Sequence, residues 1–453
     1  MDLKKKESLT EIVDRVGERF GTRVELTGTY RHGDSQEVLR FRFENGLRLV
    51  MMPNDRAPIF TYQSWFRVGS KDEDPEKTGI AHLFEHLMFK GTTTYPTGHF
   101  DREMERRGCQ TNAATWVDWT YYTQSLAMRD DHLKTVIEFE SDRMTNLVLD
   151  APTFASELEV VKNERRVAVE DSVGGTLNEM LYALAFQEHP YRWPTIGSMA
   201  HLESVSLEDL KAFYERYYAP NNAVVVIVGD IDPAETLALV VEHYAKIPPQ
   251  TIRRPKCIPE KRQEQSQKRI IERPIAAPQM VVAFRSPNQK DPDFVALELL
   301  NDALVEGETG RLYQRLVVKD ELALDVDGYV APFAEPGLYE LFINIRRDVD
   351  PDRVIAAIQE ELDRLKVGIT AEEFDKARHN AELSLCETLE DVESMAESLG
   401  HFETNFSDFT LAFKGLEELA ALDASTLGET AKTIFDPSQR TIVIANPVNT
   451  GDA

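Results

Sequence analysis

Hydrophobic and polar positions recur along the chain with two different periods, and each period predicts one kind of element. Short apolar runs bounded by turn residues predict strands over Val224–Val228, Gln279–Phe284 and Thr441–Ala445. The stretches between such runs carry the three-to-four-residue periodicity of amphipathic helices. Both predicted classes occur in each half of the chain, so the sequence predicts strands and helices mixed throughout.

The segment Ile80–Lys90 is a predicted helix with two distinct faces. At about 100° per residue, one face is an apolar stripe formed by Ile80, Leu83, Phe84, Leu87 and Met88. The other face centres about 180° away and carries His82, Glu85, His86 and Phe89. Because the apolar stripe packs on a core, the second face remains available for chemistry.

The second face holds the motif His82-Leu-Phe-Glu85-His86, written H-x-x-E-H. Histidines at i and i+4 lie one helical turn apart, so their ring nitrogens can converge on one zinc ion. Glu85 lies beside them and could hold a metal-bound water without being a ligand. The ordinary alternative is that each histidine is solvated or satisfied in a core, but the amphipathic context favours a metal site.

A catalytic zinc site needs a third protein ligand and one open position for water. The segment 153–167 has a strongly helical composition, and Glu157 and Glu164 fall on the same face of it, seven residues apart. Either carboxylate could reach a metal. Acidic residues on helices are most often simply solvated, so periodicity alone leaves both interpretations open.

Four segments together resemble the pitrilysin and mitochondrial-processing-peptidase family, whose members are also called inverzincins. They are 79–92 around the motif, Asn112–Thr115, the Glu157/Glu164 helix and 221–230. The resemblance implies that Glu164, 78 residues after His86, is the third ligand of one Zn²⁺ per chain. It implies that Glu157 supports the site from the outer shell, and that the protein is a zinc metalloendopeptidase with Glu85 as general base.

The resemblance also implies an α+β fold with an internal duplication. Two similar domains, each a mostly antiparallel sheet covered by helices, would close like a clam-shell around a chamber. An edge strand would then bind an extended peptide substrate by β-addition. The residues expected to do so are Asn112, Ala113, Ala114 and Thr115. The alternative for this segment is an ordinary exposed edge without a ligand.

A chain of 453 residues exceeds one hydrophobic core and suggests two or three domains. A proline-rich and then basic stretch predicts a linker over 249–272, which separates a zinc-binding domain, 1–248, from a homologous domain, 273–453. Placing Gly91 on Gly307 aligns the two halves without a gap. On that alignment the second half lacks the metal motif, because His82, Glu85 and His86 fall on Glu298, Asn301 and Asp302.

Composition narrows the choice of partners. The chain is 42% apolar and carries 51 basic and 78 acidic residues, a net charge of −27, which disfavours nucleic acid and anionic membranes as partners. Three widely spaced cysteines predict neither disulfides nor a cysteine metal site. No signal-peptide core and no run of about 18 apolar residues occurs, so we expect a cytoplasmic protein, or a periplasmic one if an export signal was removed.

One departure from the family predicts a partner subunit. The family resemblance places an arginine and a tyrosine, seven residues apart, in the second half, where they bind substrate and stabilise the oxyanion. Val317 and Leu324 stand there in this chain, and neither can donate a hydrogen bond. We expect a heterodimer whose similar-sized homologous subunit supplies the pair; Arg311 and Tyr313, in another register, are the alternative source.

Two other functional classes stay open at this point. The chain could be a structural or peptide-binding subunit whose peptidase activity has lapsed, or a chaperone-like module with a purely structural zinc. The sequence does not specify the physiological substrate, the cleavage preference, or a processing as opposed to a degradative role.

Overall fold

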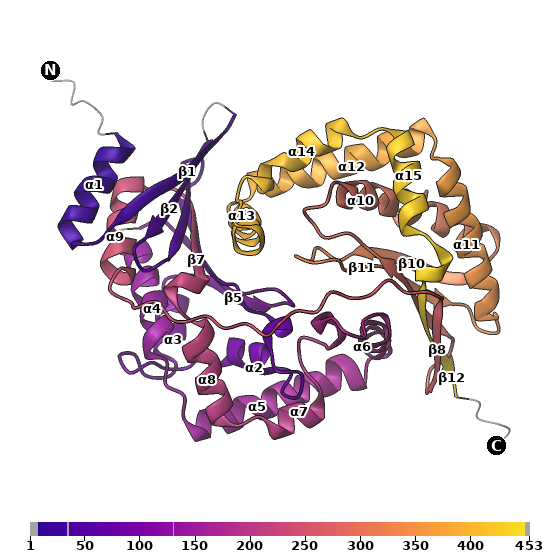
Figure 1. The fold of residues 1–453 in the computed structure, drawn as a ribbon, viewed down its shortest axis with the longest axis horizontal. Coiled ribbons are helices and arrows are strands. Elements are labelled where there is room, and N and C mark those ends of the chain that lie inside the picture. Colours follow the sequence, from indigo (N-terminus) through magenta and orange to yellow (C-terminus); the bar gives the residue numbers. More distant parts are fainter. Residues whose placement is uncertain (1–7, 34–35, 130, 449–453) are drawn as a thin grey trace. The chain divides into compact units, whose positions relative to one another are not determined.

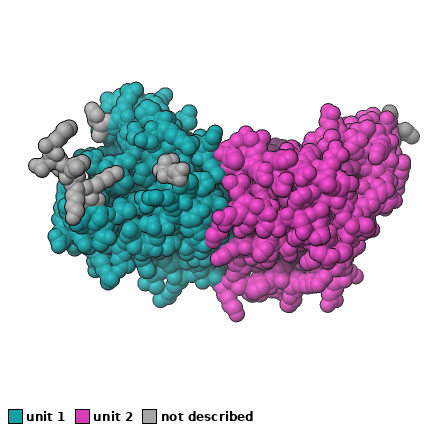
Figure 2. All heavy atoms as spheres, turned by 90° about the horizontal axis from the view of Figure 1, so that it is seen from above, with its two compact units in different colours: residues 1–161, 195–255, 388–413 teal, residues 162–194, 256–387, 414–453 magenta. Residues whose placement is uncertain are grey.

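The computed structural model describes residues 8–33, 36–129 and 131–448, and these form two compact units (Figure 1). Unit 1 comprises 1–161, 195–255 and 388–413, and unit 2 comprises 162–194, 256–387 and 414–453 (teal and magenta in Figure 2). None of the helices in the described part of the chain has the length and apolar character that a membrane crossing requires.

Unit 1 is built on a seven-stranded sheet in which only the β3–β7 pair is parallel. In spatial order its strands are β1 (Val24–His32), β2 (Gln36–Phe43), β3 (Arg48–Pro53), β7 (Ala223–Gly229), β4 (Ile59–Phe66), β6 (Thr120–Ala127) and β5 (Gln110–Thr115). The strand predicted at 224–228 is the central strand β7, buried along its whole length, which explains why its sequence is continuously apolar.

Helices cover both faces of this sheet. They are α1 (Leu9–Phe20), α2 (Ile80–Leu87), α3 (His99–Arg106), α4 (His132–Asn146), α5 (Ala151–Arg165), α7 (Met199–Ser204), α8 (Leu207–Tyr217), α9 (Pro233–Tyr244) and α13 (Val392–Phe406). Successive side chains of β3 point to opposite faces of the sheet and enter two different cores. Leu49 and Met51 pack in the core shared with α1, α2, α4 and α9, whereas Val50 and Met52 pack in the core shared with α13.

The helix α13 lies very close to the sheet. A Cβ atom at Gly400 would come within 2.1 Å of Trp65 Nε1, so only glycine permits this approach. The next turn of α13 is held by Glu403, whose carboxylate accepts from Arg48 at 2.8 Å and from Arg40 at 3.2 Å. Apolar contact and buried ion pairs together fix α13 on unit 1.

Unit 2 repeats the plan with a five-stranded sheet in which only β12 and β8 are parallel. Its strands, in spatial order, are β10 (Ala323–Val330), β11 (Leu338–Ile345), β9 (Gln279–Arg285), β12 (Thr441–Pro447) and β8 (Gln267–Arg273). Its helices are α6 (Val173–Ala185), α10 (Pro292–Val305), α11 (Pro351–Val367), α12 (Ala371–Glu390), α14 (Leu411–Ala421) and α15 (Ala424–Ile434), of which α12 and α14 begin or end in unit 1. The predicted α+β class with two mostly antiparallel, helix-covered sheets is confirmed.

The compact units do not coincide with the predicted partition into 1–248 and 273–453. Each half of the sequence contributes a segment to the other unit: 162–194, with α6, joins unit 2, and 388–413, with α13, joins unit 1. Composition reveals no such exchange, because the apolar face of a helix does not identify the sheet it covers. The partition into 1–248 and 273–453 rests on the sequence duplication and stays a prediction.

Two predicted boundaries need correction. The linker 249–272 ends earlier, because β8 already begins at Gln267; its polar sequence reflects an exposed edge strand paired only with β12. The helix predicted over 80–90 ends at Leu87. Its last turn tightens, since Phe89 N–H donates to the carbonyl of His86 at 3.3 Å and Lys90 N–H to that of Leu87 at 3.0 Å.

Candidate metal centre

The helix α2 carries the H-x-x-E-H motif and is anchored at its N-terminus by a buried carboxylate. Glu73, 2% exposed, accepts from the backbone N–H of Gly79 at 2.9 Å and of Ala81 at 2.7 Å. These bonds satisfy N–H groups that the first turn of a helix leaves without partners. Burial raises the pKa of Glu73 to about 8, against the lowering effect of the two N–H donors. Glu73 thereby fixes where α2 starts.

The two faces of α2 are as the sequence predicts. Ile80, Ala81, Leu83, Phe84 and Leu87 are buried, whereas His82, Glu85 and His86 are partly exposed. The rings of His82 and His86 lie with their centroids 4.9 Å apart. Burial, and secondarily the charge of His86, lowers the pKa of His82 to about 4. His82 is therefore a neutral imidazole at neutral pH, the form that binds metals.

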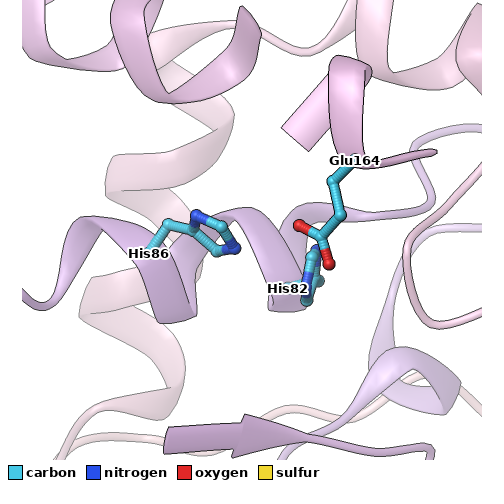
Figure 3. Close-up of side chains that lie close together, drawn as sticks. All are labelled: His82, His86 and Glu164. Atoms are coloured by element: carbon cyan, nitrogen blue, oxygen red, sulfur yellow. The ribbon is translucent and has the colours of Figure 1, made fainter. Parts of the chain in front are cut away.

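The helix α5 brings Glu164 to the two histidines. One ligand atom from each of His82, His86 and Glu164 lies within 4.8 Å of the others (Figure 3). The boundary between the units falls inside α5, at 161/162, but the helix runs unbroken to Arg165, so Glu164 continues the helix that carries Glu157. Two imidazoles and one carboxylate form the donor set of a catalytic zinc site, with a fourth position for water. The residues present fit zinc.

Glu157 lies two turns before Glu164 on α5, close to His86 and Lys90. It is 9% exposed, and its Oε1 accepts from Lys90 Nζ at 2.9 Å. Its Oε2 lies 3.9 Å from His86 Nδ1, too far for a hydrogen bond but close enough to favour a proton on that nitrogen. With the proton on Nδ1, Nε2 is the ring atom of His86 that can bind a metal.

Glu85 lies near a pair of buried tyrosines. The hydroxyls of Tyr122 and Tyr218 are 3.0 Å apart. Burial raises the pKa of both hydroxyls, and the negative charge of Glu85 adds to the increase. Both tyrosines therefore stay protonated at neutral pH next to Glu85.

The strand β5, predicted as an edge over 112–115, is the terminal strand of the unit 1 sheet and pairs only with β6. Its first residues, Gln110 to Asn112, are exposed, Ala113 and Ala114 are half-buried, and Thr115 is buried. The helix α2 packs against this strand. Within the described part of the chain, a strand edge without a second partner strand thus lies beside the helix that carries the H-x-x-E-H motif.

Sequence reasoning missed several residues that position the centre. Glu73 had a weak signal, an acidic residue shortly before a predicted helix start. Lys90 lies at i+4 from His86, but nothing in the sequence connected it with Glu157. Tyr122 and Tyr218, 96 residues apart, meet only through the fold. Contacts of this range cannot be read from the local period of a sequence.

A second group of potential donors occurs in unit 2. His189 Nε2 lies 3.1 Å from Cys257 Sγ and 3.2 Å from Glu335 Oε2. The backbone N–H of Tyr191 donates to His189 Nδ1 at 3.2 Å. A neutral imidazole whose Nδ1 accepts must carry its proton on Nε2, so no lone pair faces the cysteine and the carboxylate. This group is satisfied as a hydrogen-bonded cluster and fits a metal poorly.

Two family models match successive parts of the chain. Residues 49–198 match the insulinase family (peptidase family M16), and 204–381 match the peptidase M16 inactive domain. The chain is 28% identical to the zinc protease PqqE of Helicobacter pylori, over 89% of this chain and 91% of that protein. It is 30% identical to an uncharacterized zinc protease of Mycobacterium bovis, over 81% of this chain and 84% of that one.

A solved structure of a related protein has the same fold. The crystal structure of a protease from Helicobacter pylori superposes with a TM-score of 0.86 at 27% identity, over 90% of this chain and 99% of that one. The resemblance to the pitrilysin and mitochondrial-processing-peptidase family is confirmed, and the chain belongs to the insulinase family, peptidase family M16.

Proposed function

We propose that the protein is a zinc-dependent metalloendopeptidase with its catalytic centre on α2 and α5. The observation that carries the proposal is the convergence of His82, His86 and Glu164, with Glu85 on the same helix as both histidines. When bound by these three residues, one zinc ion per chain would acidify a water and polarise the scissile carbonyl. Glu85 takes the proton of the attacking water and passes it to the leaving amine, so the peptide bond is hydrolysed.

Glu157 acts as a positioning residue in this scheme. Its carboxylate lies between Lys90 Nζ and His86 Nδ1, so Lys90 holds it in place and it in turn orients the imidazole. Such outer partners fix the tautomer of a metal-binding histidine. The assignment makes Glu157 important for metal affinity, although it does not reach the metal.

The substrate is an extended peptide, or an unfolded or precursor segment, that adds as a strand to β5. Asn112, Ala113, Ala114 and Thr115 offer backbone N–H and C=O groups at the free edge of the sheet. The proximity of β5 to α2 supports this location, because a strand added there runs beside the metal-binding helix. Main-chain recognition of this kind accepts many sequences, as a peptidase of broad specificity requires.

A partner subunit is the second part of the proposal. Leu324 is 56% exposed on β10 and Val317 is half-buried. Both side chains are apolar, so neither offers a side-chain hydrogen-bond donor. Arg311 and Tyr313, the alternative pair, already make other contacts. Arg311 donates to both carboxylate oxygens of Glu373 at 2.6 and 2.8 Å, and Tyr313 packs against the core of unit 2. A homologous subunit of similar size would supply the missing arginine and tyrosine.

The test is a peptide or casein assay of the purified chain, alone and with a candidate partner that carries the Arg/Tyr pair. We expect zinc in the isolated chain, little turnover alone, and turnover on addition of the partner. Full activity of the isolated chain would refute the heterodimer and keep the peptidase.

The second candidate is a structural or peptide-binding subunit with lapsed peptidase activity. Val317 and Leu324 favour it, because an incomplete oxyanion site is also what a lapsed enzyme would have. A chain that contains zinc but stays inactive with every matched partner would establish this alternative.

A further inference from the structure

Unit 1 contains a concentration of positive charge that contrasts with the net charge of −27. A cavity of 660 Å³ is lined by five arginines, and Glu403 is the only carboxylate among its lining residues. The arginines come from β2, from β3, from the end of β4 and from the extended segment after α9; they are Arg40, Arg42, Arg48, Arg67 and Arg254. Every lining residue belongs to unit 1.

Three of the five arginines have structural tasks. Arg40 and Arg48 bind the carboxylate of Glu403, which is 0% exposed, and Arg48 also donates to its backbone carbonyl at 2.8 Å. Arg254 donates to the backbone carbonyl of Arg67 at 2.7 Å, and its Nε lies 3.5 Å from Asp72 Oδ1. The negative charge near the cavity is therefore already used by the arginines that hold the fold.

Arg42 and Arg67 are not matched in this way. Among the residues that the structure describes, no carboxylate forms an ion pair with either guanidinium. Arg42 lies directly opposite Arg48 in the β2–β3 ladder, and like charges at opposed positions destabilise a sheet. Glu25 faces Arg42 from β1, but its carboxylate pairs with Arg23. The sheet thus holds a repulsive pair at this cavity.

The mutual repulsion extends across the cavity. Burial lowers the pKa of Arg48, and the charges of Arg67 and Arg40 lower it further against the opposing effect of Glu403. Burial also lowers the pKa of Arg254, where Arg67 again acts against the carboxylate, here Asp72. The guanidinium of Arg67 therefore acts on Arg48 and on Arg254, which come from different segments. An anion placed among these three guanidinium groups would attract each of them and so offset their mutual repulsion.

We propose that this cavity binds a polyvalent phosphate oxyanion, of which pyrophosphate is the simplest. The guanidinium fork donates two parallel hydrogen bonds to phosphate oxygens, and Arg42 and Arg67 have their forks available. A single carboxylate would compensate only part of the excess positive charge, whereas a polyvalent phosphate compensates most of it. None of the residues proposed to bind zinc lines the cavity, so the anion site is independent of the peptidase centre.

Isothermal titration of pyrophosphate into the full chain, at constant ionic strength, tests the proposal. Arg67→Gln and Arg42→Gln should each weaken binding at least about tenfold, as expected when a charge-assisted pair of hydrogen bonds is lost. Neither residue takes part in the buried Glu403 network, so both variants should fold. The matched control is Arg269→Gln, which removes one exposed arginine from β8 and should leave the affinity unchanged. Failure of the wild-type chain to bind, or equal binding by all variants, overturns the proposal.

Two further sets of titrations show which site binds pyrophosphate and which kind of anion that site prefers. After metal removal with EDTA and dialysis, pyrophosphate should bind with the same affinity; loss of binding would assign it to the metal centre instead. Inorganic phosphate, citrate and a hexaglutamate peptide, titrated at matched ionic strength, should all bind more weakly than pyrophosphate. Tighter binding of hexaglutamate would make the cavity a site for an acidic peptide and contradict the phosphate assignment.

Discussion

The two helices α2 and α10 occupy equivalent places in the two halves of the chain and carry different polar side chains. The ungapped alignment that places Gly91 on Gly307 shifts every residue by 216 positions. It carries His82, Glu85 and His86 onto Glu298, Asn301 and Asp302, and the same shift carries Glu164 onto Asn380 and Asn112 onto Gly328.

The structure gathers these counterparts into one place in unit 2. Glu298, Asn301 and Asp302 on α10, Asn380 on α12 and Gly328 on β10 all line a cavity of 630 Å³. Desolvation and the nearby charge of Asp302 raise the pKa of Glu298 to about 7. Desolvation raises the pKa of Asp302 to about 6, although a hydrogen bond from Asn380 opposes the increase.

The two halves share an arrangement of helices and strands but differ in the side chains that could bind a metal. Both halves keep a helix against an edge strand and a second helix beside it, so the halves differ in the side chains that these helices carry. Two imidazoles and a carboxylate suit zinc, whereas in the counterpart cavity desolvation favours the protonated forms of Glu298 and Asp302.

Replacing Glu85 with glutamine should abolish turnover while zinc remains bound. The amide cannot accept the proton of water, and general-base catalysis contributes about 10² to 10⁴ in rate, so we expect a loss of about a thousandfold or more. The measurement is kcat on a fluorogenic peptide, in the active complex, with metal content determined on the same sample. Asn301→Asp, at the equivalent position of unit 2, is the control and should leave kcat within a factor of about two. Substantial activity of Glu85→Gln would break the assignment of the base.

His82→Ala and Glu164→Ala should each remove most of the zinc, because two remaining ligands do not make a stable site. Metal content by mass spectrometry should fall from one equivalent to a small fraction of one. The matched controls are Glu298→Ala and Asn380→Ala, which alter the counterpart cavity and should retain the full equivalent. Equal zinc loss from both sets of variants would show that the contrast between the halves is wrong.

Glu157→Ala should weaken zinc binding without preventing it. Loss of an outer-shell partner typically costs about 10- to 100-fold in metal affinity, since the imidazole loses its preferred orientation. Competition with a zinc chelator measures the change. Glu373, the counterpart in unit 2, pairs with Arg311, so Glu373→Ala should lower stability but leave zinc affinity unchanged. If Glu157→Ala binds zinc as tightly as the wild type, its positioning role is refuted.

The smallest expected effect is on the pH dependence of stability through Glu298. Its pKa is raised from 4.5 to about 7 in the folded protein, so the native state keeps this proton to a higher pH than the unfolded chain does. Its contribution to the free energy of unfolding is therefore greatest below pH 4.5 and declines as the pH rises to about 7. Glu298→Gln should remove this decline, by at most about 1 kcal/mol after solvent screening. Urea unfolding at a series of pH values measures it; parallel curves for both proteins would refute the raised pKa.

Several strands and the two faces of α2 could be predicted from the sequence alone. The strands at 224–228, 279–284 and 441–445 and the faces of α2 follow from local periods, and a local period is a property of the residues themselves. The spacing of His82 and His86 indicated a metal for the same reason. The choice of Glu164 needed the family resemblance, because an exposed glutamate on a helix has no distinctive pattern.

The remaining parts depend on contacts between distant segments. The exchange of 162–194 and 388–413 between the units, the pairing of Lys90 with Glu157 and the capping of α2 by Glu73 leave no local period. The arginine cavity is the clearest case: a net charge of −27 disfavours polyanions for the chain as a whole, while five arginines from different segments converge in the fold. Net charge averages over such local concentrations.

Anomalous scattering at the zinc edge, from crystals grown with zinc, would locate the metal and its ligands. We expect one strong peak per chain, bound by His82, His86 and Glu164, and no peak in the cavity of Glu298 and Asp302. A peak bound instead by unit 2, at that cavity or at His189 and Cys257, with none at the H-x-x-E-H helix, would contradict this expectation.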